Sequence, residues 1–264
     1  MSDDAFFEMN RQGWNARTEY HLASDFYDVE GFLRGECALT PIEKKILGDV
    51  SGKSLLHLQC HFGQDTLSWA RRGAQVCGVD LSDKSIEAAK NLAQQLQIDA
   101  EFVCCNVYDT RKHVQKQFDI VFTSYGVIGW LPDLAPWARV IAESLKPGGT
   151  FLLVEFHPVV WMFNDEFSEV AWPYFNVAPI IEENHGTYAD PNAPIHFQSA
   201  GWNHSIAEVV NALLEQGLRI ELLDEYDYSP YPIFRNGVQS ENGWQVKDLE
   251  GKLPLVYAVR AVKS

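Results

Sequence analysis

A glycine turn and an acidic residue stand at the ends of two consecutive apolar runs. The turn QCHFGQDT at 59–66 follows the run SLLHLQ at 54–59, and its Gly63 opens a helical pattern. Asp80 ends the next run, AQVCGVD at 74–80. Free N–H groups at a helix N-terminus bind carboxylates or phosphates, and a carboxylate at a strand end can accept both hydroxyls of a ribose. Turn and acid together predict a site for an adenosine-type cofactor.

Polar and aromatic side chains also follow two later apolar runs, FDIVFTS at 118–124 and TFLLVEF at 150–156. We expect a small-molecule substrate to bind beside them, since ligands of such folds bind at the carboxyl ends of the strands. The candidate catalytic groups there are His157, Tyr125 and Glu155. The candidate substrate contacts are Trp130 and Trp161.

His157 allows two interpretations. Its reference pKa of about 6.5 would let it accept a proton from a hydroxyl or an amine near neutral pH. It could instead tie down the turn before Pro158 through a backbone carbonyl, which is an equally physical use of the ring. Glu155 is open in the same way, because it could pair with a backbone amide.

Short apolar runs that alternate with helical patterns predict the elements that position these residues. A third run, AEFVCC, occupies 100–105, and helices are expected over about 63–72, 82–96 and 134–145. Continuously apolar strands separated by helices are typical of a parallel sheet covered on both faces, with right-handed crossovers.

The chain after the fifth run completes this sheet. An aromatic, irregular insert at about 158–202 precedes a helix that begins at Ser205, and the β-rich runs 218–225 and 253–262 follow. The predicted fold class is α/β: a doubly wound, seven-stranded, mostly parallel sheet with helices on both faces. An N-terminal helical lid is expected over 1–50, and the remaining domain is expected to span 51–264.

Four segments carry a resemblance to one family. LLHLQCHFG resembles the first motif of class I S-adenosylmethionine-dependent methyltransferases, which have a Rossmann-like fold, and GVDLS resembles the second. FDIVFTSYGVIGWLPDL and SLKPGG are similar to the fourth and post-fourth segments. The resemblance covers about 50–157 and recurs in the C-terminal helix and hairpin. It implies S-adenosyl-L-methionine as cofactor and transfer of its methyl group to O, N or S of a small molecule.

The resemblance also implies which residues surround the cofactor. The first-motif residues would surround its methionine part, and Asp80 would hold the ribose. Other residues would border the adenine or form the floor of the site. These implied contacts are Gln59, Cys60, His61 and Gly63 for the methionine part, Leu81, Asn106 and Val107 for the adenine, and Ser124 and Tyr125 for the floor.

The first motif departs from the family pattern at three positions. His57 stands where the family has an acidic residue, and Gln59 and His61 stand where it has two of its three glycines. The family's contacts to the methionine end therefore cannot be copied onto this chain. His57 is either a neutral histidine hydrogen-bonded inside the sheet or a group that orients the loop.

The N-terminal segment mixes aromatic and polar residues, as in WNARTEYHLASDFYDVEGF at 14–32. Similar methyltransferases fold such a segment over the cofactor as a lid. By that analogy Arg17 and Tyr20 are candidates for the cofactor carboxylate, since a guanidinium binds a carboxylate through two hydrogen bonds. The alternative is a surface arginine beside a core tyrosine.

The insert at 158–202 is too aromatic for an ordinary linker, and we interpret it as a substrate cap or as an oligomer contact. Ring faces and carboxylates both favour positive charge, which suits a small, partly apolar and cationic acceptor. The spacing of His185, His196 and His204 does not place metal ligands on one helical face, so no metal site is expected.

Composition bears on partners and location. A net charge of -15 and a pI near 4.9 disfavour nucleic acid, because a polyanion would be repelled. No leader pattern and no apolar run of about 18 residues is present, so we expect a cytoplasmic protein without a membrane partner. It would be a monomer or a homodimer.

Two other functions are open. One is an NAD(P)-dependent oxidoreductase, although side chains at Gln59 and His61 narrow the space that a pyrophosphate needs. The other is a regulator that binds an adenosyl ligand without catalysis.

Overall fold

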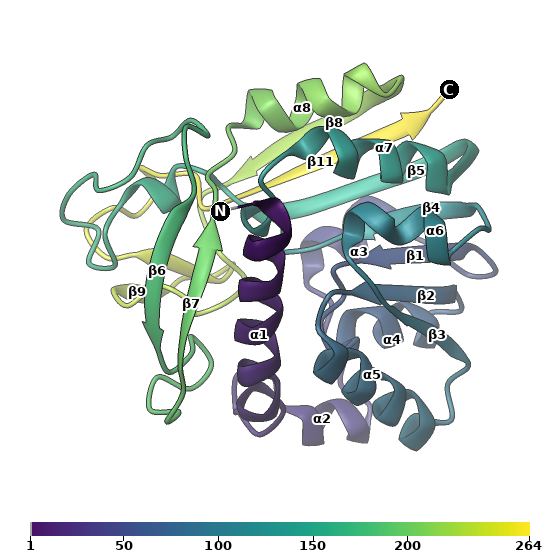
Figure 1. The fold of residues 1–264 in the computed structure, drawn as a ribbon, viewed down its shortest axis with the longest axis horizontal. Helices are drawn as coiled ribbons and strands as arrows, with labels where there is room; N and C mark the ends of the chain where they lie inside the picture. The colour runs from purple at the N-terminus through teal and green to yellow at the C-terminus, as the bar shows by residue number, and fades with distance from the viewer. Residues whose placement is uncertain (1) are drawn as a thin grey trace.

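The computed structural model describes residues 2–264, and a seven-stranded sheet runs through its centre in the order β3-β2-β1-β4-β5-β11-β8 (Figure 1). The first five strands are parallel, and β11 is antiparallel to both β5 and β8. The strands are β1 (Ser54–Leu58), β2 (Gln75–Asp80), β3 (Ala100–Cys104), β4 (Phe118–Thr123), β5 (Leu145–Phe156), β8 (Leu218–Tyr226) and β11 (Val256–Lys263). The predicted α/β class with a mostly parallel sheet is confirmed.

β5 begins earlier than the sequence predicts. The turn KPGG at 146–149 lies inside the strand as an irregularity, since the pairing with β4 jumps from Phe118 opposite Leu145 to Ile120 opposite Thr150. Gly148 has a φ of 74° there, a backbone conformation that glycine adopts without a steric penalty.

Two layers of helices cover the sheet. One face is covered by α7 (Leu134–Ser144), α8 (Ile206–Glu215), the short 3₁₀ helix η1 (Val107–Asp109) and α6 (Thr110–His113). The other face is covered by α3 (Pro41–Leu47), α4 (Gln64–Arg71) and α5 (Asp83–Leu96). Both layers arise because successive strand residues point to opposite faces and both sets are apolar.

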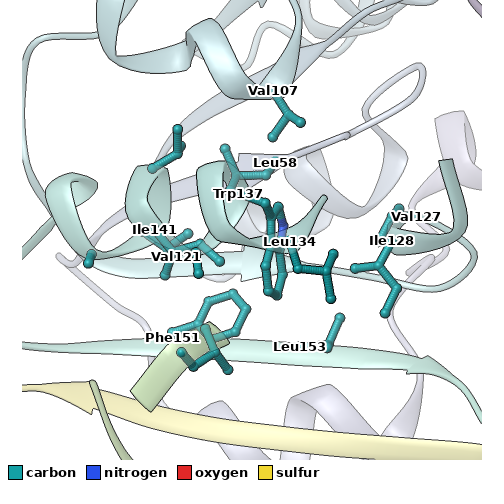
Figure 2. Packing of buried hydrophobic residues seen from close by; sticks show 14 of the residues in the cluster. Leu58, Val107, Val121, Val127, Ile128, Leu134, Trp137, Ile141, Phe151 and Leu153 are labelled. Atoms are coloured by element: carbon teal, nitrogen blue, oxygen red, sulfur yellow. The ribbon is translucent and has the colours of Figure 1, made fainter. Parts of the chain in front are cut away.

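Trp137 is central to the first layer. It projects from α7 onto the sheet beside Leu134 and Ile141, where strand residues such as Val121 and Phe151 meet it (Figure 2). Its ring is fully buried and contacts that of Phe151 edge to face, with centroids 5.6 Å apart. This packing fixes α7 and hence the loop that precedes it after β4.

The predicted N-terminal segment 1–50 divides into two parts. α1 (Asp3–Leu22) runs beside the strand β7 of the insert, and α2 (Val29–Arg34) follows it (Figure 1). α3 instead packs on the sheet through Ile42, in the same cluster as Leu55 and Trp69. The last part of the segment thus belongs to a helical layer, Phe32 of α2 packs with residues of α4 and α5, and α1 lies against the insert.

The insert at 158–202 is less irregular than expected. After the 3₁₀ turn η3 (Val160–Met162) it forms an antiparallel hairpin of β6 (Ile180–His185) and β7 (His196–Gly201). A second small hairpin, β9 (Gly237–Gln239) with β10 (Trp244–Val246), lies in the excursion between β8 and β11. Among the helices of residues 2–264, none is long and apolar enough to cross a membrane.

Candidate functional site

A cavity of about 1160 Å³ opens at the carboxyl ends of β1, β2, β4 and β5. α1, the insert and the excursion after β8 supply its other walls. Most of the residues predicted from the sequence line it: Arg17, Gln59, Cys60, His61, Gly63, Asp80, Leu81, Asn106, Val107, Ser124, Tyr125, Trp130, Glu155 and Trp161. Tyr20 and His157 do not.

The loop after β1 keeps a glycine-like backbone at positions without glycine. Gln59 and His61 have φ values of 56° and 50°, and Gly63 has 81°. A residue with a side chain pays roughly 1–2 kcal/mol for this left-handed conformation. Gly63 is required for packing as well, because an added Cβ would lie 2.8 Å from the Phe102 ring and 3.0 Å from Ala89 Cβ.

The two unusual side chains of this loop are both engaged. Gln59 Nε2 donates to the Val127 carbonyl at 2.8 Å, while its Oε1 is buried and has no partner within residues 2–264. The His61 ring lies 3.0 Å from Ser85 Oγ through Nδ1 and 2.9 Å from His21 Nδ1 through Nε2. These contacts hold the loop in its strained conformation.

His61 belongs to a hydrogen-bonded chain that joins four parts of the molecule. His21 on α1 contacts Thr187 of the insert at 3.1 Å through Nε2, and His61 contacts Ser85 on α5. Burial lowers the pKa of His21 to about 3 and that of His61 well below its usual value, so both rings are neutral. One ring must then donate and the other accept at their contact.

Asp80 lies at the end of β2, where the ribose was expected. Its two carboxylate oxygens accept the backbone N–H groups of Ser82 and His61, both at 2.8 Å. Burial raises its pKa to about 6, and these hydrogen bonds oppose that rise. Each carboxylate oxygen accepts more than one hydrogen bond, so the group retains lone pairs for a ligand.

Arg17 on α1 is buried and unpaired. Its side chain is 6% exposed, and its guanidinium carbon lies 4.2 Å from the ring centroid of Phe197 and 4.7 Å from that of Trp14. Within residues 2–264 it has no hydrogen bond or ion pair partner, and burial lowers its pKa to about 10. A buried charge is costly unless paired, so this guanidinium is prepared for an anion.

The cavity-lining face of α1 explains why Tyr20 is absent from the site. Asn10, Trp14 and Arg17 line the cavity at intervals of three or four residues, and His21 continues this row. Tyr20 is half-buried and lies off the row. The predicted contact of Tyr20 with the cofactor carboxylate therefore has no support in this geometry.

The Glu155 carboxylate accepts hydrogen bonds from backbone N–H groups. It accepts N–H groups from Val127 at 2.8 Å, Ile128 at 3.2 Å and Phe156 at 2.7 Å, and it also accepts that of Gly126. The carboxylate thereby fixes the loop after β4. The sequence left open a catalytic role or pairing with a backbone amide, and the structure shows the backbone pairing.

The structure corrects the predicted catalytic role of His157. This residue is 4% exposed and lies outside the cavity wall, with Nε2 2.8 Å from Glu225 Oε1 and Nδ1 accepting the Val159 N–H at 3.2 Å. Burial lowers its pKa. Both ring nitrogens are occupied in fixing the turn after β5, so the ring is not available as a general base.

Tyr125 turns its ring, not its hydroxyl, to the cavity. The hydroxyl donates to Glu43 Oε2 at 3.2 Å and lies 3.1 Å from Thr40 Oγ1, both on the α3 side. Its ring centroid is 5.1 Å from that of Tyr231 and 5.6 Å from that of Phe156. Its expected catalytic role is thereby reduced to forming an aromatic wall.

His57 joins Ser124 to the helix after the loop. Its Nδ1 lies 2.8 Å from Thr66 Oγ1 and its Nε2 3.3 Å from Ser124 Oγ, which donates to Asp65 Oδ2 at 3.3 Å. Burial lowers the pKa of His57 to about 3. It is thus a neutral, hydrogen-bonded histidine that also orients the site floor.

The sequence analysis did not single out the cavity residues Asp65, Tyr27 and Tyr231, or His21, which contacts His61. Asp65 carried a usable signal, because it stands in the first turn of the helix that follows the β1 loop, at the ligand end of the sheet. The others lie far apart in the chain. Residues 2–264 contain no group of three or more His, Cys, Asp or Glu side chains able to hold a metal.

Fold and site together define a Rossmann-like α/β protein with a large cavity at the strand ends. Residues 56–153 match a family model described as a methyltransferase domain. A solved S-adenosylmethionine-dependent methyltransferase from Mesorhizobium loti shares the fold, with a TM-score of 0.58, 19% identity, and coverage of 88% of this chain and 100% of that one.

Curated relatives carry methyltransferase names as well. The ubiquinone biosynthesis O-methyltransferase of Coxiella burnetii is 30% identical over 131 residues, covering 48% of this chain and 55% of the relative. That of Idiomarina loihiensis is 25% identical over 214 residues, covering 78% and 85%. The chain thus spans about half the length of the Coxiella relative and most of the Idiomarina one.

Proposed function

We propose that this chain is an S-adenosylmethionine-dependent methyltransferase that transfers a methyl group to O, N or S of a small molecule. One observation carries the proposal. The unpaired, buried guanidinium of Arg17 and the carboxylate of Asp80 line one cavity at the strand ends of a domain that matches a methyltransferase family. The cofactor has an anion for the first group and ribose hydroxyls for the second.

The residues present fit this cofactor. Arg17 would pair with its methionine carboxylate, Asp80 would accept the ribose hydroxyls, and Leu81, Asn106 and Val107 would border the adenine. When bound, the cofactor supplies an electrophilic methyl group on a positively charged sulfur. The buried, unpartnered Oε1 of Gln59 provides an acceptor beside the methionine part.

The chain's task in such a reaction is to position the reactants and to exclude water. Methyl transfer is an in-line displacement, for which holding the acceptor near the methyl carbon supplies much of the acceleration. α1, the β6–β7 hairpin and the excursion after β8 all contribute walls to the cavity and thus enclose it. A small molecule suits this enclosed site, and the net charge of -15 opposes a nucleic acid substrate.

Calorimetric titration of the purified protein with S-adenosylhomocysteine and with NADH tests the proposal. We expect S-adenosylhomocysteine to bind and NADH not to bind, because Gln59 and His61 side chains fill the space where a dinucleotide needs glycine. Asp80→Asn should weaken S-adenosylhomocysteine at least about tenfold, whereas Glu183→Gln, an exposed carboxylate at the cavity wall, should not. NADH binding without S-adenosylhomocysteine binding would overturn it.

A further inference from the structure

Asp65 is a cavity-lining carboxylate that the proposed cofactor site does not use. It stands in the first turn of α4, and its Oδ2 accepts the Ser124 hydroxyl at 3.3 Å. Within residues 2–264 no lysine, arginine or histidine forms an ion pair with it. Asp65 is therefore presented to the cavity without a cationic partner.

Aromatic side chains surround this part of the cavity. The Tyr231 ring lies 5.1 Å from Tyr125 and 5.8 Å from Phe26 between centroids. The Tyr27 hydroxyl is 2.5 Å from that of Tyr188, and burial first, then the neighbouring hydroxyls and Asp65, raise the pKa of Tyr27. Ring faces attract cations, so the rings and the carboxylate favour the same kind of ligand.

A second carboxylate lies behind the aromatic wall. Glu43 is fully buried in α3, where it accepts from Thr40 and from the Tyr125 hydroxyl. Burial, and then the charge of Glu43, raise the pKa of Asp65 to about 7, while the hydrogen bond from Ser124 opposes the rise. The other titratable groups facing Asp65 are Tyr27 and Tyr231, and His57 behind Ser124 is neutral.

The cavity as a whole is acidic. Its lining includes eight acidic residues and two arginines, which leaves an excess of six negative charges if all are ionised. The acidic residues are Asp28, Glu36, Asp65, Asp80, Glu155, Asp165, Glu182 and Glu183, and the arginines are Arg17 and Arg235. A cationic acceptor would reduce this excess, and a neutral one would not.

We propose that the methyl acceptor is an amine, bound as an ammonium ion against Asp65 with its apolar part among Phe26, Tyr125 and Tyr231, and that Asp65 takes its proton. This inference rests on the proposed methyltransferase function and deepens it. A phenol or another oxygen acceptor, as the names of the curated relatives would suggest, brings no positive charge to the site.

The transfer balances with the groups present. A proton moves from the ammonium nitrogen to a carboxylate oxygen of Asp65, which frees the nitrogen lone pair. The nitrogen then forms a bond to the methyl carbon as the carbon–sulfur bond breaks and its electron pair stays on sulfur. The products are a neutral thioether, a methylated ammonium ion and a proton that Asp65 later releases to solvent. A base that titrates near neutral pH suits this step.

Competitive probes of similar size test the proposal on the protein saturated with S-adenosylhomocysteine. Calorimetry would compare phenethylamine, a cation at pH 7.5, with 4-ethylphenol, a neutral oxygen acceptor. We expect the wild-type protein to bind the amine at least about tenfold more tightly, the preference that a desolvated charge pair provides. Asp65→Asn should remove this preference, while Asp65→Glu and the control Asp99→Asn, at an exposed carboxylate outside the cavity lining, should retain it.

Equal or tighter binding of 4-ethylphenol by the wild-type protein, or no measurable binding of either probe, overturns the amine acceptor, and so does a preference that survives Asp65→Asn. The wild-type comparison needs no variant to fold. S-adenosylhomocysteine binding on the same samples separates the two failures: if it is lost in the wild-type protein the methyltransferase function fails, and if it is kept only the acceptor fails.

Discussion

Two residues of the loop after β1 combine a strained backbone with side-chain hydrogen bonds to other elements. Gln59 and His61 adopt left-handed backbone conformations, and each uses its side chain to reach another element, Val127 in one case and His21 in the other. Left-handed conformations of residues with a Cβ persist where the surroundings stabilise them, often at functional sites. The loop therefore has a shape that its own sequence disfavours and its neighbours enforce.

A matched pair of variants tests the strain at His61. Both His61→Ala and His61→Gly remove the ring and its hydrogen bonds, but only glycine adopts a φ of 50° without a steric penalty. We expect the glycine variant to be about 1 kcal/mol more stable than the alanine variant in chemical denaturation. An alanine variant of equal or greater stability would contradict the left-handed backbone at this position.

Arg17 is expected to contribute to ligand binding at the expense of stability. Arg17→Met keeps much of the side-chain length and removes a buried charge that has no partner within residues 2–264, so the free energy of unfolding should stay level or rise. S-adenosylhomocysteine affinity should fall at least about tenfold in calorimetry, because the carboxylate loses its partner. Arg34→Met, an exposed arginine on α2, is the control, and equal affinity in both variants would exclude Arg17 from the site.

The raised pKa of Asp65 predicts that the difference in stability between the wild-type protein and Asp65→Asn depends on pH. The pKa of Asp65 is raised from 3.8 to about 7 in the folded protein, so the folded state holds a proton that the unfolded state has released between these values. Stability is therefore lost as pH rises through this window. Asp65→Asn lacks this loss, and its free energy of unfolding relative to wild type should increase between pH 4 and 7 and then level off. A difference independent of pH would show that Asp65 is not perturbed.

Residue roles were only partly predictable. Asp80, Gln59 and His61 line the cavity because topology brings strand ends together, and their contacts with a cofactor stay predictions. Topology could not show which polar atoms are free. His157 was predicted and Asp65 was not, although both follow strands at the ligand end of the sheet. His157 has both ring nitrogens occupied and Asp65 lines the cavity, a difference that depends on tertiary neighbours.

Elements remote in sequence enclose the site. α1 and the β6–β7 hairpin lie side by side (Figure 1), and Asn10 joins them through its amide, which donates to the Ala200 carbonyl and accepts the Ala200 N–H, both at 2.9 Å. The chain from Ser85 through His61 and His21 to Thr187 connects the same walls to the cofactor loop. α1 and the insert therefore form a continuous part of the cavity wall.

The Asn10 contact can be tested by its removal. Asn10→Ala leaves the buried backbone groups of Ala200 without their partners, which should cost about 1–3 kcal/mol of stability. Hydrogen exchange across β6 and β7 should accelerate, because the hairpin loses its attachment to α1. Gln12→Ala, on the exposed side of α1, should change neither quantity. Unchanged exchange in the Asn10 variant would show that other contacts hold the hairpin.

The elements themselves were largely predictable, with one informative exception. Continuous apolar runs identified the parallel strands, since strands buried on both faces admit few polar residues. The hairpin strands IIEENH and HFQSAG escaped detection because they are solvated and polar. Their stability comes from packing against α1, and a local pattern does not record it.

At the scale of the whole molecule, the net charge and the charge of the cavity lining have the same sign. The chain carries a net charge of -15, and the cavity lining repeats that sign. Such a field attracts positively charged small molecules, including a cofactor with a sulfonium group, and repels polyanions. The fold supplies the rigid frame, while two mostly irregular segments and an N-terminal helix complete the site that the sheet begins.

A crystal structure of the protein with S-adenosylhomocysteine tests the central claim most directly. We expect the ligand in the cavity at the carboxyl ends of β1 and β2, with its carboxylate on the Arg17 guanidinium and its ribose hydroxyls on Asp80. A ligand bound elsewhere, or one in this cavity that leaves both Arg17 and Asp80 without contact, would contradict the account.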